Sequence, residues 1–90
     1  NDEALYPYAV EAANALSIPY IEPTPSTAGD DFSTFADYAP AYFFWLGNYN
    51  EDKDTIYPLH SPKFKIDTDT LSIGAGIYAM SALSYLNHIK

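Results

Sequence analysis

The sequence predicts an α/β fold in which helices pack against a largely parallel sheet, and three observations lead to this class. Apolar residues recur at helical spacing between Asp2 and Leu16. A six-residue apolar run, 41–46, does not alternate with polar residues, which is typical of a parallel strand with both faces covered. A stretch without charged residues separates Asp69 from Lys90, which indicates a long apolar helix.

The first helix is expected from Asp2 to Leu16, and Asp2 has the residue type of an N-cap. Pro7 falls in the second turn, where a proline shortens or kinks the start of a helix. The short apolar stretch Ile18–Glu22 is expected to form a strand. Residues 23–29 have the proline, glycine and hydroxyl residues of a loop.

A short helix is expected over residues 30–36, with Asp30 or Asp31 as its N-cap and Pro40 beyond its end. The non-alternating strand follows directly. After it, residues 48–56 are polar and acidic, and we expect them to form a loop.

The last element is expected to be a helix from Thr68 to Ile89, capped by Asp67 or Thr68. Its apolar residues lie on nearly every side, so the helix should be buried nearly all round. Gly74 and Gly76 each lower helix stability by about 1 kcal/mol relative to Ala, and they indicate close approach of another backbone. A transmembrane span is the competing interpretation, and the serines and small residues of the helix disfavour it.

Composition limits the class of protein further. Ninety residues form at most one domain, and such a chain buries only about 60% of its unfolded surface. Yet 48% of the residues are hydrophobic and 17% are aromatic. We therefore expect some apolar surface to be covered by a partner or by the rest of a longer polypeptide.

The net charge of −8 disfavours nucleic acid and anionic membrane surfaces as partners. The absence of cysteine excludes a disulfide scaffold, a cysteine-ligated zinc and a thiol nucleophile. Any bound metal would need histidine and carboxylate ligands. No basic or apolar leader is visible at Asn1, and because the chain begins without Met, its true N-terminus is expected to lie upstream, so the targeting of the protein is not read from this sequence. The expected location is cytoplasmic.

The sharpest motif is Pro58-Leu59-His60-Ser61-Pro62, a histidine between two prolines. A stiff turn holds an imidazole in place, so little entropy is lost when it binds a metal such as Zn²⁺. The alternative is a surface histidine that is hydrogen-bonded within its own turn.

Four segments then occur in one order: GDDFS at 29–33, AYFFWLG at 41–47, LHSPKF at 59–64 and LSIGA at 71–75. Together they resemble the C-terminal segment of the aminoacylase/carboxypeptidase-type metal-dependent amidohydrolases. This family includes hippurate hydrolases and N-acyl-amino-acid amidohydrolases. No single segment is specific, whereas the ordered set is.

The resemblance implies that residues 1–90 are the C-terminal portion of a catalytic domain, an α/β sandwich whose lid domain and N-terminal portion lie outside this chain. It implies metal-dependent cleavage of the amide bond of N-acyl amino acids or small peptides, with Zn, Mn, Co or Ni as the divalent metal. It places the catalytic residues outside these ninety residues. We therefore expect the chain alone to be inactive and to bind no metal tightly.

The resemblance also implies roles for particular residues. His60 would be a metal ligand, and Gly29, Asp30 and Asp31 would border the substrate. The family pattern at the acidic pair is Glu-Asp, so the side chain of Asp30 is one methylene shorter. The competing interpretation of both aspartates is N-capping of the short helix, which their position favours.

The expected partner is the rest of the parent catalytic domain or a copy of this chain. A second hypothesis belongs to another class of protein: a non-catalytic interaction or oligomerisation module on the same scaffold. Its binding surface would be the apolar helix over residues 71–86. A much longer gene product would favour the enzyme portion over the module.

Overall fold

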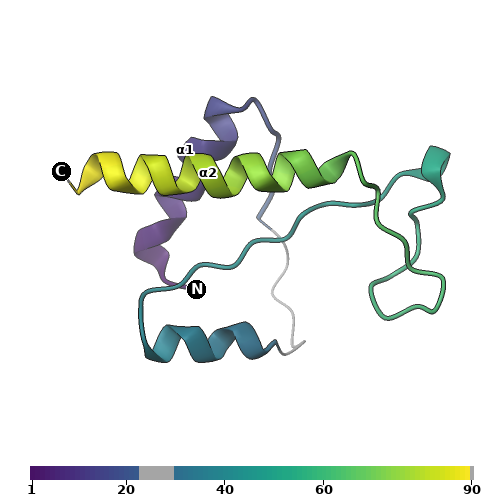
Figure 1. Ribbon diagram of the computed structural model, residues 1–90, viewed down its shortest axis with the longest axis horizontal. Helices are drawn as coiled ribbons and strands as arrows, with labels where there is room; N and C mark the ends of the chain where they lie inside the picture. The colour runs from purple at the N-terminus through teal and green to yellow at the C-terminus, as the bar shows by residue number, and fades with distance from the viewer. Residues whose placement is uncertain (23–29, 90) are drawn as a thin grey trace.

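A computed structural model describes residues 1–22 and 30–89. These residues form two α-helices, α1 and α2, and three short 3-10 helices, η1, η2 and η3. The two α-helices cross and pack against each other, and an extended segment, 40–49, runs beside α2 (Figure 1).

The first helix begins as the sequence predicts. The side chain of Asp2 accepts a hydrogen bond from the backbone N–H of Ala4 at 2.9 Å and caps η1, Glu3–Leu5. The chain continues directly into α1, Tyr6–Ala15. Pro7 lies in the first turn of α1, where its missing N–H removes no helical hydrogen bond.

The short helix η2, Asp31–Asp37, is also confirmed, as a 3-10 helix. The side chain of Asp30 accepts a hydrogen bond from the N–H of Phe32 at 2.8 Å, so Asp30 is the N-cap. Beyond the extended segment, η3, Glu51–Lys53, forms a single turn.

The prediction of an α/β sandwich with a largely parallel sheet is wrong for the described residues, which contain no strand. Residues 18–22 are irregular, and residues 41–46 are extended without a neighbouring strand. Instead, the side chain of Asn1 pairs with the backbone of Phe43, accepting from its N–H and donating to its C=O, both at 2.8 Å. The apolar run indicates only that these residues are hydrophobic, whereas the hydrogen bonds of a sheet also require a second extended backbone alongside. Trp45, predicted to be covered, is 64% exposed.

The long helix α2, Thr70–His88, is present where the sequence predicts a helix. The predicted cap, Asp67 or Thr68, is wrong: the N-cap is Asp69, and its side chain makes no capping hydrogen bond. The carboxylate of Asp67 instead accepts from the N–H of Asp69 at 3.1 Å, and its C=O accepts from the N–H of Thr70 at 3.0 Å. Of the described helices, none is long and apolar enough to cross a membrane.

The expectation that this helix is buried nearly all round is wrong. Only Gly74, Ile77 and Ser84 are buried in α2. Several large apolar side chains are more than half exposed: Leu71, Tyr78, Leu83 and Leu86. The described chain simply has too few residues to cover every side of the helix.

The two helix glycines face side chains rather than another backbone. A Cβ at Gly76 would lie 3.1 Å from the Cδ1 atom of Leu16, and a Cβ at Gly74 would lie 3.1 Å from the Cδ2 atom of Leu46. Gly76 therefore makes room for the residue that follows α1, and Gly74 makes room for the extended segment.

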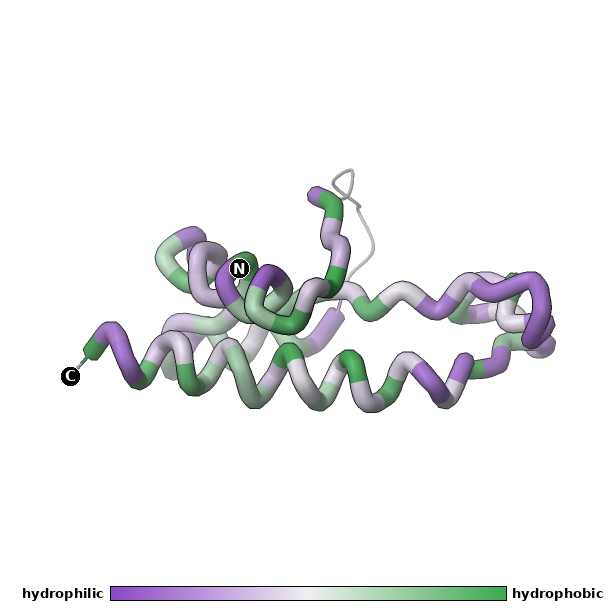
Figure 2. Tube along the Cα trace, turned by 90° about the horizontal axis from the view of Figure 1, so that it is seen from above, coloured by the Kyte–Doolittle hydropathy of each residue, from purple (hydrophilic) through white to green (hydrophobic). Residues whose placement is uncertain are grey.

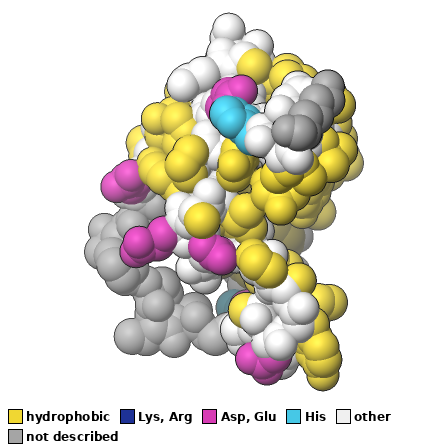
Figure 3. Space-filling view, turned by 90° about the vertical axis from the view of Figure 1, so that its left-hand side faces the viewer, with side chains coloured by type: hydrophobic (Ala, Val, Ile, Leu, Met, Phe, Trp, Pro, Cys, Tyr) yellow, Lys and Arg dark blue, Asp and Glu magenta, His cyan; other side chains and the backbone are white. Residues whose placement is uncertain are grey.

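The core is small and the surface is large. The buried hydrophobic residues are Ala12, Ala13 and Ile77. The radius of gyration is 14.6 Å, against about 12 Å for a compact domain of this length. The accessible area is 7228 Å², against about 5,200 Å² for a compact monomer of this mass. Hydrophobic side chains cover much of the face at the C-terminal end (Figure 3). The chain thus exposes the apolar surface that its composition predicts.

Candidate functional site

The turn that carries His60 lies at the end of the molecule where α2 begins (Figure 1). The N–H of Ser61 donates to the C=O of Pro58 at 2.9 Å, and the N–H of Phe64 donates to the C=O of Ser61 at 3.0 Å. The Oγ atom of Ser61 accepts from the N–H of Lys63 at 3.2 Å. Successive tight turns therefore shape this segment, and His60 is exposed on it.

A polar cluster lies beside this turn, made of Asn48, Asn50, Lys53, Thr55 and Asp67. Hydrophilic residues are concentrated at this end of the molecule, opposite the C-terminus (Figure 2). The ammonium group of Lys53 donates to Asp67 Oδ1 at 2.9 Å and also pairs with Asp69. Asn50 Nδ2 donates to Asp67 Oδ2 at 3.1 Å. Asp67 is only 7% exposed, so its charge is almost fully enclosed by these donors.

These contacts shift two pKa values in opposite directions. The hydrogen bond from Lys53, followed by the one from Asn50, holds the pKa of Asp67 below its ordinary value. The hydrogen bonds to Asp69 and then to Asp67 hold the pKa of Lys53 above its ordinary value. The cluster is therefore stable as an ionised group at neutral pH.

The fit of a metal to this site rests on its donor set. Among residues 1–22 and 30–89, no group of three or more His, Cys, Asp or Glu side chains is arranged to hold an ion. His60 offers one imidazole, and the carboxylate of Asp67 in the polar cluster is already bonded to Lys53. A protein zinc site uses at least three protein ligands, so the others would have to come from outside the described residues.

The predicted substrate-binding residues are placed only in part. Gly29 lies outside the described residues. The carboxylate of Asp30 is engaged as the N-cap of η2, the role that its position favours. Asp31 is exposed in the first turn of η2. No hydrogen bond or ion pair of the described residues joins either aspartate to the turn that carries His60.

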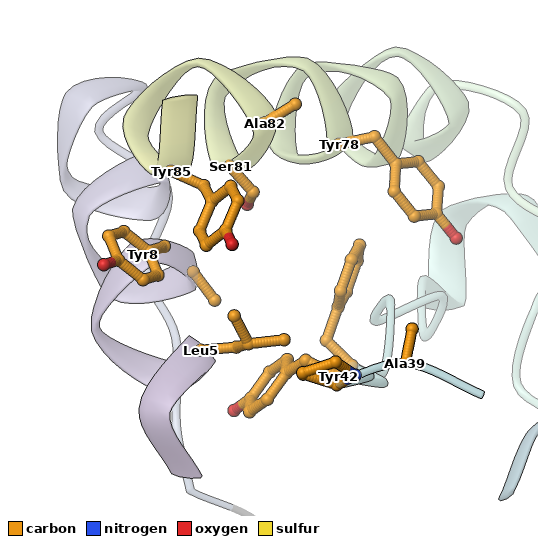
Figure 4. A pocket seen from close by; sticks show the side chains of 11 residues that line it. Leu5, Tyr8, Ala39, Tyr42, Tyr78, Ser81, Ala82 and Tyr85 are labelled. Atoms are coloured by element: carbon orange, nitrogen blue, oxygen red, sulfur yellow. The ribbon is translucent and has the colours of Figure 1, made fainter. Parts of the chain in front are cut away.

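The structure also contains a hollow that the sequence does not reveal. It has a volume of about 440 Å³ and lies between α1, the segment around Tyr42 and α2 (Figure 4). Five of its eleven lining residues are aromatic, and Tyr8 and Tyr85 meet edge to face at a centroid distance of 5.4 Å. Burial raises the pKa of Tyr42, and the carboxylate of Glu22 adds to this effect. The tyrosines are visible in the sequence, but the crossing of the helices that brings them together is not.

The buried hydroxyl of Ser81 lies on the wall of this hollow and has no hydrogen-bond partner among the described residues. Figure 4 shows Ser81, Tyr78 and Tyr85 on the side of α2 that faces the hollow. A polar atom left unpaired against apolar walls is unfavourable. This part of the interior is therefore incompletely satisfied within the described chain.

Comparison with known proteins decides the family. Residues 1–84 match the model of the peptidase family M20/M25/M40. The chain belongs to this peptidase family. The resemblance carried by the four ordered segments is thereby confirmed at the level of the family.

Curated relatives of this M20 peptidase-family chain are hydrolases by name. Thermostable carboxypeptidase 2 of Saccharolobus solfataricus is 43% identical over 67 residues, which cover 74% of this chain and 17% of that protein. An IAA-amino acid hydrolase of Arabidopsis thaliana is 30% identical over the whole chain and 21% of that protein. N-acetyl-L-cysteine deacetylase of Bacillus subtilis is 36% identical over 74% of this chain and 15% of that protein. The M20 chain thus spans about a fifth or less of these relatives. No solved structure matches it.

Proposed function

We propose that this chain is part of a metal-dependent hydrolase that cleaves the amide bond of N-acyl amino acids or small peptides. Membership of the M20/M25/M40 peptidase family is the observation that carries the proposal. The names of the relatives, a carboxypeptidase, an amino acid conjugate hydrolase and a deacetylase, share the hydrolysis of an amide bond. The catalytic residues lie outside residues 1–90, and these residues are inactive by themselves.

His60 is the metal ligand that this chain contributes. Its exposed side chain on a turn bounded by Pro58 and Pro62 supports this role, because the turn limits the entropy that ligation removes. The metal is Zn, Mn, Co or Ni, and when bound it supplies a Lewis acid that polarises the amide carbonyl. The part of this chain is to hold one imidazole nitrogen at a fixed place.

The loop that contains Gly29, Asp30 and Asp31 borders the substrate. The exposure of Asp31 at the start of η2 supports this role. The carboxylate of Asp30 acts indirectly, since it is bonded to the N–H of Phe32 and fixes the start of the helix.

The partner of this chain is the rest of the catalytic domain, or a copy of the chain when it is produced alone. The exposed apolar side of α2 and the unpaired hydroxyl of Ser81 support such a partner. The proposal includes a cytoplasmic location of the intact protein, which cell fractionation would test. If the gene product ends with these residues, the non-catalytic interaction module replaces the enzyme portion.

The direct test replaces His60 with Ala in the intact protein and measures bound metal and amide hydrolysis. Both should fall by more than about 100-fold, because even the outer-shell partners of metal ligands contribute 10–100-fold. His88→Ala is the matched control, since His88 contacts Glu11 at 3.4 Å in the other half of the molecule. Its metal content and activity should stay within about threefold of the parent. Full metal content and activity in His60→Ala would refute the assignment. Metal-dependent hydrolysis by residues 1–90 alone would refute their inactivity.

A further inference from the structure

Asn48 contacts both arms of the chain that lead to and from the His60 turn. Its backbone C=O accepts a hydrogen bond from the hydroxyl of Thr55 at 2.6 Å, on the arm that enters the turn. Its side-chain Nδ2 donates to the C=O of Lys65 at 2.6 Å, on the arm that leaves the turn. Its Oδ1 accepts from the N–H of Asp67 on the same outgoing arm. One residue thereby joins the two ends of the segment 55–65.

Further contacts join the same two arms. The ammonium group of Lys65 pairs with Asp54 Oδ2 at 2.9 Å. The donors from Asn50 and Lys53 reach the carboxylate of Asp67 on the opposite arm. Every one of these contacts lies outside the turn itself, so they close the base of the loop without contacting His60.

Burial identifies which of these contacts restrict the loop most. Thr55 is 4% exposed and Asp67 is 7% exposed, whereas the Lys65–Asp54 pair is more than half exposed on each side chain. A hydrogen bond that is shielded from water is held more rigidly than an exposed ion pair. The Asn48 contacts to Thr55 and Asp67 therefore fix the base of the loop, and the exposed ion pair adds little.

We infer that Asn48 is the positioning residue for His60, acting with Thr55 and Asp67 to hold the proline-bounded turn at one place and angle. The inference rests on the proposed role of His60 as a metal ligand. Closing a loop at its base removes conformational freedom from the residues at its tip, so the entropy of fixing the imidazole is lost on folding and not on metal binding. Asn48 itself contacts neither metal nor substrate.

The test uses Asn48→Ala in the intact protein, with Asn87→Ala as the matched control on the exposed end of α2. In the metal-free protein, hydrogen exchange at the Ser61 and Phe64 amides should become about tenfold faster in Asn48→Ala, since those amides donate the turn hydrogen bonds. The dissociation constant for Zn²⁺ should rise about 10–100-fold. Asn87→Ala should change both quantities by less than about twofold.

A second pair of variants guards against simple misfolding. Thr55→Val keeps the shape of the buried side chain and removes its hydroxyl, whereas Thr55→Ser keeps the hydroxyl. Thr55→Val should accelerate hydrogen exchange in the turn and weaken Zn²⁺ binding, whereas Thr55→Ser should leave both the exchange rate and the Zn²⁺ affinity close to those of the parent. Equal behaviour of the two variants would overturn the inference.

A double-mutant comparison separates positioning from general stability. In a His60→Ala background, Asn48→Ala should no longer change the dissociation constant for Zn²⁺, although it should still accelerate exchange in the turn. An equal loss of affinity in both backgrounds would overturn the positioning role. If His60→Ala alone leaves Zn²⁺ affinity unchanged, the proposed ligand fails. The exchange data then decide separately whether Asn48 orders the turn.

Discussion

Residues 48–69 and the pair of α-helices differ in how far their buried polar groups are hydrogen-bonded and their apolar side chains are covered. In the polar segment, each buried polar side chain has partners close by: Thr55 bonds Asn48, and Asp67 bonds Asn50 and Lys53. In the helical layer, α2 leaves large apolar side chains exposed, and the hydroxyl of Ser81 is buried without a partner. The polar segment therefore satisfies its buried polar groups from within its own residues, whereas the helical layer has apolar surface and a buried hydroxyl that the described residues leave without partners.

The largest effect expected from this contrast concerns two apolar residues of α2. In the isolated chain, Ile77→Ala should lower the free energy of unfolding by about 2–4 kcal/mol, because Ile77 is 8% exposed. Leu71→Ala should lower it by less than about 0.5 kcal/mol, because Leu71 is 54% exposed. In the intact protein, Leu71→Ala should become about as harmful as Ile77→Ala. Urea denaturation of both variants in both contexts measures the difference. An equally small effect of Leu71→Ala in both contexts would show that this side of α2 stays uncovered.

The next effect concerns the response of the polar segment to acid. The pKa of Asp67 lies below its ordinary value of 3.8, so this group stabilises the folded segment above about pH 4. The stabilisation is lost as the pH falls through the lowered pKa. Lys53→Met should raise the titration midpoint of Asp67, because it removes the main donor to the carboxylate. Side-chain carboxyl NMR reports that midpoint directly.

Lys63→Met is the control for this titration. It makes the same chemical change at a lysine whose Nζ atom lies 5.6 Å from the centre of the Tyr57 ring, outside the polar cluster. The midpoint of Asp67 should stay unchanged in this variant. An equal shift in both variants would point to net charge, and not to the specific hydrogen bond, as the cause.

A smaller effect is expected at the contact between the two helices. Gly76→Ala gains about 1 kcal/mol of helix propensity. The new Cβ would lie 3.1 Å from the terminal Cδ1 atom of Leu16, so that flexible side chain has to shift slightly. The free energy of unfolding should therefore change by less than about 1 kcal/mol. A loss of more than about 2 kcal/mol in thermal denaturation would mean that the packing between α1 and α2 is tighter than this contact indicates.

The smallest effect is expected at the surface between Tyr6 and Glu22. The Tyr6 hydroxyl donates to Glu22 Oε1 at 2.6 Å, and this bond is the main reason that the pKa of Tyr6 is raised from 10.0 to about 12. The bond stabilises the folded state below about pH 10 and is lost as the pH rises through 12. Glu22→Gln should move the end of an ultraviolet titration of the nine tyrosines to lower pH while changing stability little, and burial should keep the pKa of Tyr42 raised in the variant. An unchanged titration curve would argue against the bond.

The parts of the fold that the sequence predicts correctly are set by short-range chemistry. Asp2 and Asp30 each accept a hydrogen bond from an N–H two residues further along, and these pairs can be recognised within a few residues of sequence. The helices that these aspartates precede are found where expected. The sheet is not, because the run 41–46 reports hydrophobicity without identifying a backbone to pair with.

The candidate site divides in the same way. Two prolines predict the stiff turn around His60, and the structure contains successive tight turns there. The contact between Asn48 and Asp67 joins residues 19 positions apart in an irregular segment, and no periodic pattern in the sequence predicts it. The aromatic hollow depends on how α1 crosses α2, which single-sequence periodicity does not specify.

The exposed apolar side chains along α2 affect how long these residues survive in a cell. Chaperones and quality-control proteases act on polypeptides that display apolar side chains, and proteolysis removes them from the folding equilibrium. A peptide of this sequence produced alone would therefore be short-lived, whereas the same residues with this side of α2 covered would persist. The rate at which the peptide is degraded would then depend on how rarely another protein binds α1 and α2 and covers their exposed apolar side chains.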